Sequence, residues 1–437
     1  MPTFAPVDKV LIIGSGPVRI GQAPAIDVAA CRACAELKAA GRQTVMIHCD
    51  PSALASDVET ADTTYLMPLT ERTIADVIDK ERPDSLLPTV GGAAAMSLTR
   101  SLVQSGLLER TGVRLLGVSE RTLNLIDDPA AFHDAVSRLG LATPRRQFAD
   151  QVSDAAALAE QMGYPVFVRT SGPSDPQRCG IVFNVEELRS RLTGRRPAAA
   201  SVRAVGIEPA LTGHREIEVA LLRDAANRMT IATLAENVDP VGIHSSDSTT
   251  VIPAATISAS TRHAIEQAAF QIAEHADASG SVHLKFAVPP DSQTVLVLAL
   301  NPMPGPLTAL CDSALGTSLA AVHTRLALGY DLDEAMAAGG AAAKSRSASG
   351  DSVVVRLPCW EFERFPGETV KLDARPRSTG AVFGIGGTFL EALCHADRAR
   401  SPASAAVGPQ PDLLPPGRDE LMRALVPAAP DRLATMV

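Results

Sequence analysis

Residues 282–306 read VHLKFAVPPDSQTVLVLALNPMPGP, and this stretch decides how the chain folds. Its two apolar runs, at 282–288 and 294–300, are typical of buried β-strands, and the segment with Pro and Asp between them is typical of a turn. One charged residue, Lys285, stands inside the first run. The stretch therefore predicts two adjacent strands, with a half-exposed lysine on the first.

The same pattern continues on the N-terminal side of this stretch. Apolar runs near 215–222 and 228–234 predict two further strands, and residues 260–275 follow the spacing of an amphipathic helix. These elements together predict an α+β unit with antiparallel strands on both sides of the helix.

The first 126 residues show a different order, in which strands and helices alternate. Strands are predicted at 9–13, 43–48, 85–88 and 113–118, and helices at 25–40 and 73–80. Alternating strands and helices indicate a parallel, doubly wound sheet. Gly14 and Gly16, and then Gly91 and Gly92, fall where strands pass into helices, which is the ligand-binding edge of such sheets.

Composition excludes several classes of function. A formal net charge of −9 argues against a nucleic-acid or anionic-membrane partner, because both prefer a basic surface. No apolar stretch reaches the ~20 residues that span a bilayer, and the N-terminus does not resemble a signal peptide. Seven scattered cysteines are typical of reduced thiols. We therefore expect a cytoplasmic protein.

Four motifs carry a resemblance that covers nearly the whole chain. They are IIGSGPVRIGQ at 12–22, ERPDSLLPTVGG at 81–92, ENVDPVGIHSSDS at 236–248 and ALGYDLDE at 327–334. With them, the chain resembles the N-terminal, carboxyphosphate-forming ATP-grasp half of the large subunit of glutamine-dependent carbamoyl phosphate synthetase. The resemblance implies an α/β fold: a Rossmann-like pre-ATP-grasp domain at 1–126 and an ATP-grasp α+β domain at 127–396, with a lid at about 127–204. A Pro- and Ala-rich tail follows at 397–437.

The family's synthetase half uses ATP to activate bicarbonate, and the resemblance assigns a nucleotide site to this chain. The residues it implies are Arg169, Glu208, Glu216, Glu218, His244, Lys285 and Asn301. His244, Asp247 and Ser248 also have the residue types of a catalytic triad, but no nucleophile elbow surrounds the serine, so we do not expect one.

The chain departs from the family at its charged positions. The two family metal-ligand positions hold Lys285 and Ala299, and the family's arginines are replaced by Pro129, Met303 and Pro306. Magnesium prefers oxygen ligands, so no metal site is expected. Two alternatives stay open for the lysine: it faces solvent beside an empty pocket, or its ammonium replaces a metal ion against a phosphate or another anion.

The glycine-rich flap that the family closes over the triphosphate is also altered. In residues 169–180, RTSGPSDPQRCG, only two glycines remain, and Pro173 and Pro176 remove two backbone donors. Asp175 adds a negative charge that Arg178 partly offsets. The alternative is a plain surface loop.

These departures predict a non-catalytic binding or regulatory protein, a pseudoenzyme that binds ATP weakly and without magnesium. The expected ligand is a nucleotide or small anion, and a glutaminase-like or biosynthetic enzyme is the expected protein partner. The alternative is a working ATP-dependent ligase of the carboxylate or bicarbonate type, with an altered acceptor and unusual metal use.

Overall fold

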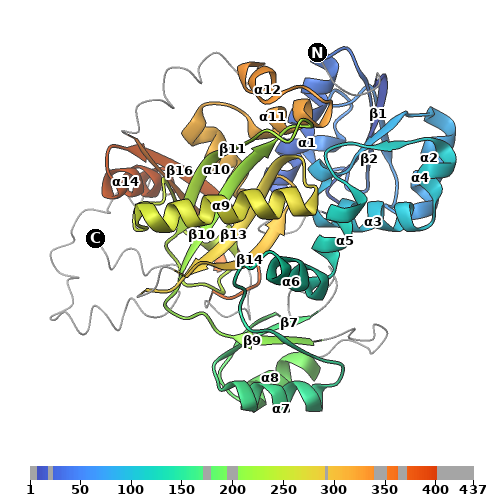
Figure 1. Cartoon of the computed structure of the whole chain (residues 1–437). Coiled ribbons are helices and arrows are strands. Elements are labelled where there is room, and N and C mark those ends of the chain that lie inside the picture. Colours follow the sequence, from blue (N-terminus) through green and yellow to red (C-terminus); the bar gives the residue numbers. More distant parts are fainter. Residues whose placement is uncertain are drawn as a thin grey trace.

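The computed structural model describes residues 7–17, 23–170, 179–193, 205–290, 294–338, 352–362 and 372–400. Most of the altered flap (171–178), the connection 194–204 and the tail after residue 400 lie outside these ranges. In Figure 1 the N-terminal domain lies on the right, a large central sheet lies behind the long helix α9, and a small lid lies below.

The N-terminal domain contains a parallel sheet, as the sequence predicts, but with five strands where four were predicted. Its strands lie in the order β3-β2-β1-β4-β5. Their bounds are β1 Lys9–Ile13, β2 Gln43–His48, β3 Thr63–Leu66, β4 Ser85–Leu87 and β5 Arg114–Leu115. The edge strand β3 was not predicted, because its sequence TTYL lacks an apolar run. β5 is shorter than the predicted strand, because Gly117 turns the chain with a φ of 73°.

Alternation along β1 explains the layers of this domain. Val10 and Ile12 pack on the face covered by α1 (Ala23–Ala39), while Leu11 and Ile13 pack on the face covered by α2 (Glu71–Glu81). Further helices are α3 (Gly92–Gln104), α4 (Leu107–Thr111) and α5 (Glu120–Asp127). Successive side chains of a strand point to opposite faces, so an unbroken apolar run is buried on both sides.

The lid is a four-stranded antiparallel sheet in the order β6-β9-β7-β8, with two helices packed on it. Its elements are β6 Gln147–Ala149, α7 Val152–Met162, β7 Val166–Thr170, β8 Gly180–Val182, α8 Val185–Thr193 and β9 Val205–Pro209. The helix α6 (Pro129–Arg138) leads into the lid, and the Asp128 carboxylate caps it by accepting from the N–H groups of Ala130 and Ala131. Pro129 therefore occupies the first helical position, which proline tolerates well.

The central sheet has seven strands in the order β14-β13-β10-β11-β12-β15-β16, and the pairs are antiparallel as predicted. The strands are β10 Arg215–Arg223, β11 Met229–Asn237, β12 Thr250–Ile252, β13 Gly280–Val288, β14 Leu296–Asn301, β15 Val353–Cys359 and β16 Gly380–Gly386. The accompanying helices are α9 Ala259–Ala276, α10 Pro306–Leu315, α11 Leu319–Ala327, α12 Leu332–Ala338 and α14 Phe389–Arg400.

The expectation that strands lie on both sides of the helix at 260–275 is wrong. Helix α9 covers one face of the sheet and packs on Ile217, Val219 and Leu221 of β10. The intervening residues, Ala220 and Leu222, face α10 and α11 on the other side. The result is a three-layer arrangement, because β10 is apolar on both faces over this length.

The N-terminal domain and the central sheet share a core. Ala327 and Leu328, at the end of α11, belong to the same apolar cluster as Val10 and Ile12 of β1. Across this contact the Arg325 guanidinium donates to the Glu36 carboxylate at 2.6 Å. No helix in the described ranges combines the length and apolar character that a membrane crossing requires.

Candidate functional site

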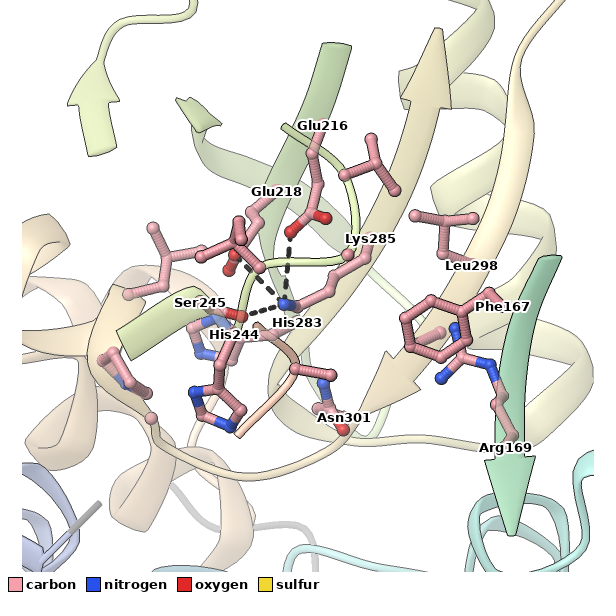
Figure 2. Close-up of a pocket in the computed structure, with 18 of the residues that line it drawn as sticks. Phe167, Arg169, Glu216, Glu218, His244, Ser245, His283, Lys285, Leu298 and Asn301 are labelled. Carbon is pink, nitrogen blue, oxygen red and sulfur yellow. Dashed lines mark hydrogen bonds and ion pairs between the residues drawn. The ribbon is translucent and has the colours of Figure 1, made fainter. Parts of the chain in front are cut away.

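A cavity of about 410 Å³ lies where the central sheet, the lid and the N-terminal domain meet. β10, β13 and β14 contribute its central residues, β7 and β9 line it from the lid, and Ile26 and Ala93 line it from the N-terminal domain. All seven residues predicted for the nucleotide site line this one cavity: Arg169, Glu208, Glu216, Glu218, His244, Lys285 and Asn301. Figure 2 shows six of them around its centre and edges.

Strand register places the central charges. Lys285 of β13 lies opposite Glu218 of β10 on one side and opposite Ala299 of β14 on the other. Glu216 lies two residues before Glu218 on β10 and therefore on the same face. The two family metal-ligand positions are thus direct cross-strand neighbours, as the resemblance implies.

The Lys285 ammonium lies between two carboxylates. Its Nζ is 3.3 Å from Oε1 of Glu216 and 3.3 Å from Oε1 of Glu218, and it also contacts the hydroxyl of Ser245. Only 21% of the lysine side chain is exposed. The alternative in which Lys285 simply faces solvent is therefore wrong, and so is the expectation of a half-exposed side chain.

A buried amide completes this cluster. The side-chain N–H₂ of Asn237 donates to Oε1 of Glu216 and to Oε1 of Glu218, both at 2.8 Å. The Thr250 hydroxyl in turn donates to the Asn237 carbonyl oxygen at 2.7 Å. Asn237 and Thr250 are buried and adjacent in the sheet, so they hold both carboxylates in place. Buried carboxylates require such partners, because an unpaired charge is costly away from water.

The pairing favours the charged forms of this cluster. Burial opposes the charge on Lys285, but the Glu218 and Glu216 carboxylates outweigh burial and raise the pKa of the ammonium. Burial also opposes ionisation of Glu218, and the Lys285 ammonium and the Asn237 hydrogen bond outweigh it and lower the pKa of that carboxyl. At neutral pH the Lys285 ammonium is therefore charged and lies beside an ionised Glu218.

Two neutral histidines lie beside the cluster. Burial, with the nearby Lys285 charge, lowers the pKa of His244 to about 4, and burial lowers the pKa of His283 to about 4. His283 was not predicted as a site residue, although it stands two residues before Lys285 on the same face of β13. Neither imidazole carries a charge at neutral pH.

The loop that carries His244 has a structural arrangement of its own. The His244 Nδ1 lies 2.6 Å from the Ser246 hydroxyl, while the Asp247 carboxylate accepts from the backbone N–H groups of Arg377 and Ser378. The buried Arg356 guanidinium donates to backbone carbonyls of this loop, including that of Ser246 at 2.6 Å. These contacts hold the loop and form no catalytic triad, as expected from the sequence.

Arg169 and Glu208 pair with each other at the lid side of the cavity. The Arg169 Nε donates to Oε1 of Glu208 at 2.7 Å, and Arg146, which the sequence analysis missed, donates to Oε2 of the same carboxylate at 2.9 Å. Burial opposes ionisation of Glu208, but the two guanidinium groups outweigh it and lower its pKa. The Arg169 guanidinium also lies 4.8 Å from the centre of the Phe167 ring.

Two family models match the chain. The carbamoyl phosphate synthase preATP-grasp domain matches residues 6–125, and the carbamoyl-phosphate synthase L chain ATP binding domain matches residues 128–335. The chain belongs to the carbamoyl phosphate synthase large-chain family. The family's large chain from Rubrobacter xylanophilus is 37% identical over 91% of this chain and 38% of its own length. The one from Archaeoglobus fulgidus is 35% identical over 91% and 37%.

The chain thus spans less than two fifths of the length of these relatives, which agrees with the single synthetase half predicted from its sequence. Solved structures show the same ATP-grasp fold at low identity. An ADP complex of N5-carboxyaminoimidazole ribonucleotide synthetase has a TM-score of 0.67 at 15% identity, covering 91% of this chain and 97% of that one. The beta-gamma-ATP complex of biotin carboxylase from Campylobacter jejuni has a TM-score of 0.62 at 16% identity, covering 81% of this chain and 76% of that one.

A magnesium ion, which the family's chemistry implies, does not fit the side chains at this site. Ala299 offers no oxygen ligand, and the Lys285 ammonium already contacts the carboxylates that a metal ion would need. Within the described ranges, no group of three or more His, Cys, Asp and Glu side chains can hold a metal ion.

Proposed function

We propose that this chain is a non-catalytic member of its family, which retains the nucleotide cavity, binds nucleotide weakly and acts as a binding or regulatory protein. A single observation carries this proposal. The Lys285 ammonium, at one of the two positions where the resemblance implies a metal ligand, contacts both Glu216 and Glu218. Phosphoryl transfer depends on cations that offset charge on the phosphates, and this ammonium is already engaged by carboxylates.

The positions beyond Asn301 support the same proposal. Met303 and Pro306 line the cavity where the family resemblance implies arginines. Neither side chain can donate a strong hydrogen bond or carry positive charge. Carboxyphosphate, a doubly charged acyl phosphate, would therefore form without its usual stabilising groups. The expected partner remains a glutaminase-like or biosynthetic enzyme in the cytoplasm.

The second candidate is an active ATP-dependent ligase with altered metal use. The observation in its favour is that Arg169, Glu208, Glu216 and His244 line one cavity together with Asn301. In such an enzyme the nucleotide phosphates would hold the divalent ion. Glu216 and Glu218 would not serve as its ligands, because both already contact Lys285.

Release of ADP separates the two candidates. The protein is incubated with ATP, magnesium and bicarbonate, with and without an ammonia source, beside a Glu216→Ala control. We expect bicarbonate to cause no ADP release above that of the control. Bicarbonate-dependent release that the control lacks would establish the ligase.

A further inference from the structure

In the part of the chain that the structure describes, the cations lining the cavity already contact carboxylates. Among the described residues that line it, the positive side chains are Arg169 and Lys285. Arg169 is paired with Glu208 at 2.7 Å, and Lys285 is paired with Glu216 and Glu218. These described lining residues therefore carry more negative than positive charge, and a triphosphate entering the cavity would lose hydration and meet cations that carboxylates already engage.

The N-terminus of α10 also lines the cavity, and helix N-termini often bind anions. Here the donors at three of its first four positions, 305, 306 and 308, are already used or missing. Pro306 has no N–H group, the Gly305 N–H donates to the Thr308 hydroxyl at 2.9 Å, and the Thr308 N–H donates to the Gly305 carbonyl at 2.9 Å. This helix therefore offers a phosphate little.

The carboxylates suit a ligand that carries hydroxyl groups. The contacts described for Glu216 and Glu218 use the Oε1 atom of each. A carboxylate has a second oxygen that also accepts hydrogen bonds, and within the described ranges Oε2 of each residue is left for the adjacent hydroxyls of a ribose. An uncharged sugar donates to such oxygens without electrostatic repulsion, whereas a phosphate cannot donate when ionised.

The walls on both sides of this polar centre are apolar. Phe167 of the lid and Leu298 of β14 offer flat or aliphatic surface for a base, as Figure 2 shows for their positions near Arg169. Met303, Pro304 and Leu307 line the cavity in the segment that follows β14. A base and a sugar fit this combination of apolar walls and central acceptors.

We propose that the ligand of this cavity is an uncharged nucleoside, bound without a divalent metal ion, and that Lys285 is a tethered cation in place of the metal. The proposal deepens the proposed function and rests on it, because it names the ligand class of the same non-catalytic site. The ammonium neutralises the buried carboxylates from within the protein, so the ligand needs to bring no cation. The sequence left open that the Lys285 ammonium binds a phosphate or another anion of a ligand. In this proposal the ammonium binds the protein's own carboxylates, those of Glu216 and Glu218.

Calorimetry with a ligand series tests the proposal. Adenosine, AMP, ADP and ATP are titrated into the protein in chelator and again with magnesium. We expect adenosine to bind most tightly, with a loss of about tenfold or more on addition of the phosphates, equivalent to about 1.4 kcal/mol. Magnesium should leave the affinity for adenosine unchanged. Affinity that rises with the number of phosphates, or a failure of adenosine to bind, would overturn the proposal.

A charge variant provides a second measurement. Met303→Arg adds a guanidinium where the family has one and should raise the affinity for AMP relative to adenosine by about tenfold. Met303→Leu changes the same side chain without adding charge and separates charge from shape. An unchanged AMP-to-adenosine ratio in Met303→Arg contradicts the proposal. If this variant does not fold, the ligand series of the natural protein still decides. Bicarbonate-dependent ADP release would contradict the proposed function instead, so the two failures are distinguishable.

Discussion

At the scale of single residues, the Lys285 ammonium separates two carboxylates that would otherwise lie unneutralised on one face of β10. Breaking a buried ion pair on one side leaves an uncompensated charge, which costs more than the pair itself contributes. A half-exposed lysine, which the sequence predicts at position 285, usually contributes little to folding. The structure changes that expectation, since Glu216 and Glu218 are each 6% exposed.

Lys285→Gln should therefore destabilise the protein by about 3 kcal/mol at pH 7, measured by urea unfolding. The folded pKa of Glu218 is lowered, so the stability it contributes is present above its unfolded pKa and is lost as pH falls through the folded pKa. The difference between natural protein and variant should shrink at low pH. Lys9→Gln breaks an ion pair with Glu81 outside the cavity and should cost about 1 kcal/mol or less. Equal losses in the two variants would contradict this prediction.

The residues that line the site could be predicted from the sequence, but the contacts between their side chains could not. Motif positions identify Glu216, Glu218 and Lys285 because the family places its ligands there. Their mutual contact depends on how β10 and β13 align, and Lys285 is 69 residues from Glu216. The contact between Lys285 and Ser245 depends on a loop that Arg356 holds in place through backbone carbonyls. No local sequence pattern predicts this loop conformation.

At the scale of elements, the pair β13–β14 determines whether the cavity can hold a metal ion. Ala299 lies opposite Lys285, so a glutamate there would point to the same face as the ammonium. With Lys285 present, the added carboxylate would pair with the ammonium. Without Lys285, it would join Glu216 and Glu218 as a set of oxygen ligands.

The double variant Lys285→Gln with Ala299→Glu should gain a magnesium-dependent rise in melting temperature, while each single variant should gain less. Carboxylate oxygens are the ligands that magnesium prefers, and only the double variant offers three without a competing ammonium. Thermal unfolding with magnesium and with chelator provides the measurement. An equal magnesium response in Ala299→Glu alone would show that the ammonium does not block the site.

Gly280 packs closely against the buried His323 ring. A Cβ at Gly280, the first residue of β13, would lie 2.3 Å from Nδ1 of His323, and Gly280 has a φ of 79°. Gly280→Ala should therefore cost about 3 kcal/mol in the free energy of unfolding, from both overlap and backbone strain. Gly41→Ala is the matched control, because Gly41 has a φ of 73° and no atom within 4 Å of the added Cβ. Similar losses at both positions would refute the overlap.

Elements were predicted well where an apolar run or helical spacing was long, as in α9 and β13. Elements were missed or wrongly placed where their position depends on packing against distant parts of the chain. The edge strand β3 pairs with β2 on one side only, and its sequence is half polar. The position of α9 on one face of the sheet depends on the strand order, which periodicity does not contain.

At the scale of the whole molecule, neutral histidines make stability depend on pH. Burial lowers the pKa values of His244, His283 and His323 to about 4. Since the unfolded value is about 6.5, unfolding takes up protons between these two values. Stability should therefore fall as pH decreases from about 6.5 towards about 4.

His323→Gln tests the contribution of one of these histidines to the pH dependence of stability. His323 accepts from the Ser281 N–H at 2.9 Å, so the neutral ring carries its proton on Nε2, which donates to Thr89 at 2.6 Å. The variant should be less stable than the natural protein at pH 7. Between about pH 4 and 6.5 its free energy of unfolding should depend less steeply on pH, with a slope smaller by about 1 kcal/mol per pH unit. Urea unfolding at several pH values gives both slopes. Parallel slopes would mean that His323 is protonated in the folded protein.

The apolar cluster shared by β1 and the end of α11 has a kinetic consequence. It fixes the N-terminal domain against the central sheet, and that domain supplies Ile26 and Ala93 to the cavity. The cavity wall formed by Ile26 and Ala93 is therefore already ordered before a ligand binds, so binding carries no entropy cost for ordering it. A ligand that needs no movement of this wall should associate at a rate that is linear in its concentration. Saturation of that rate would instead assign the slow step to a motion of the lid.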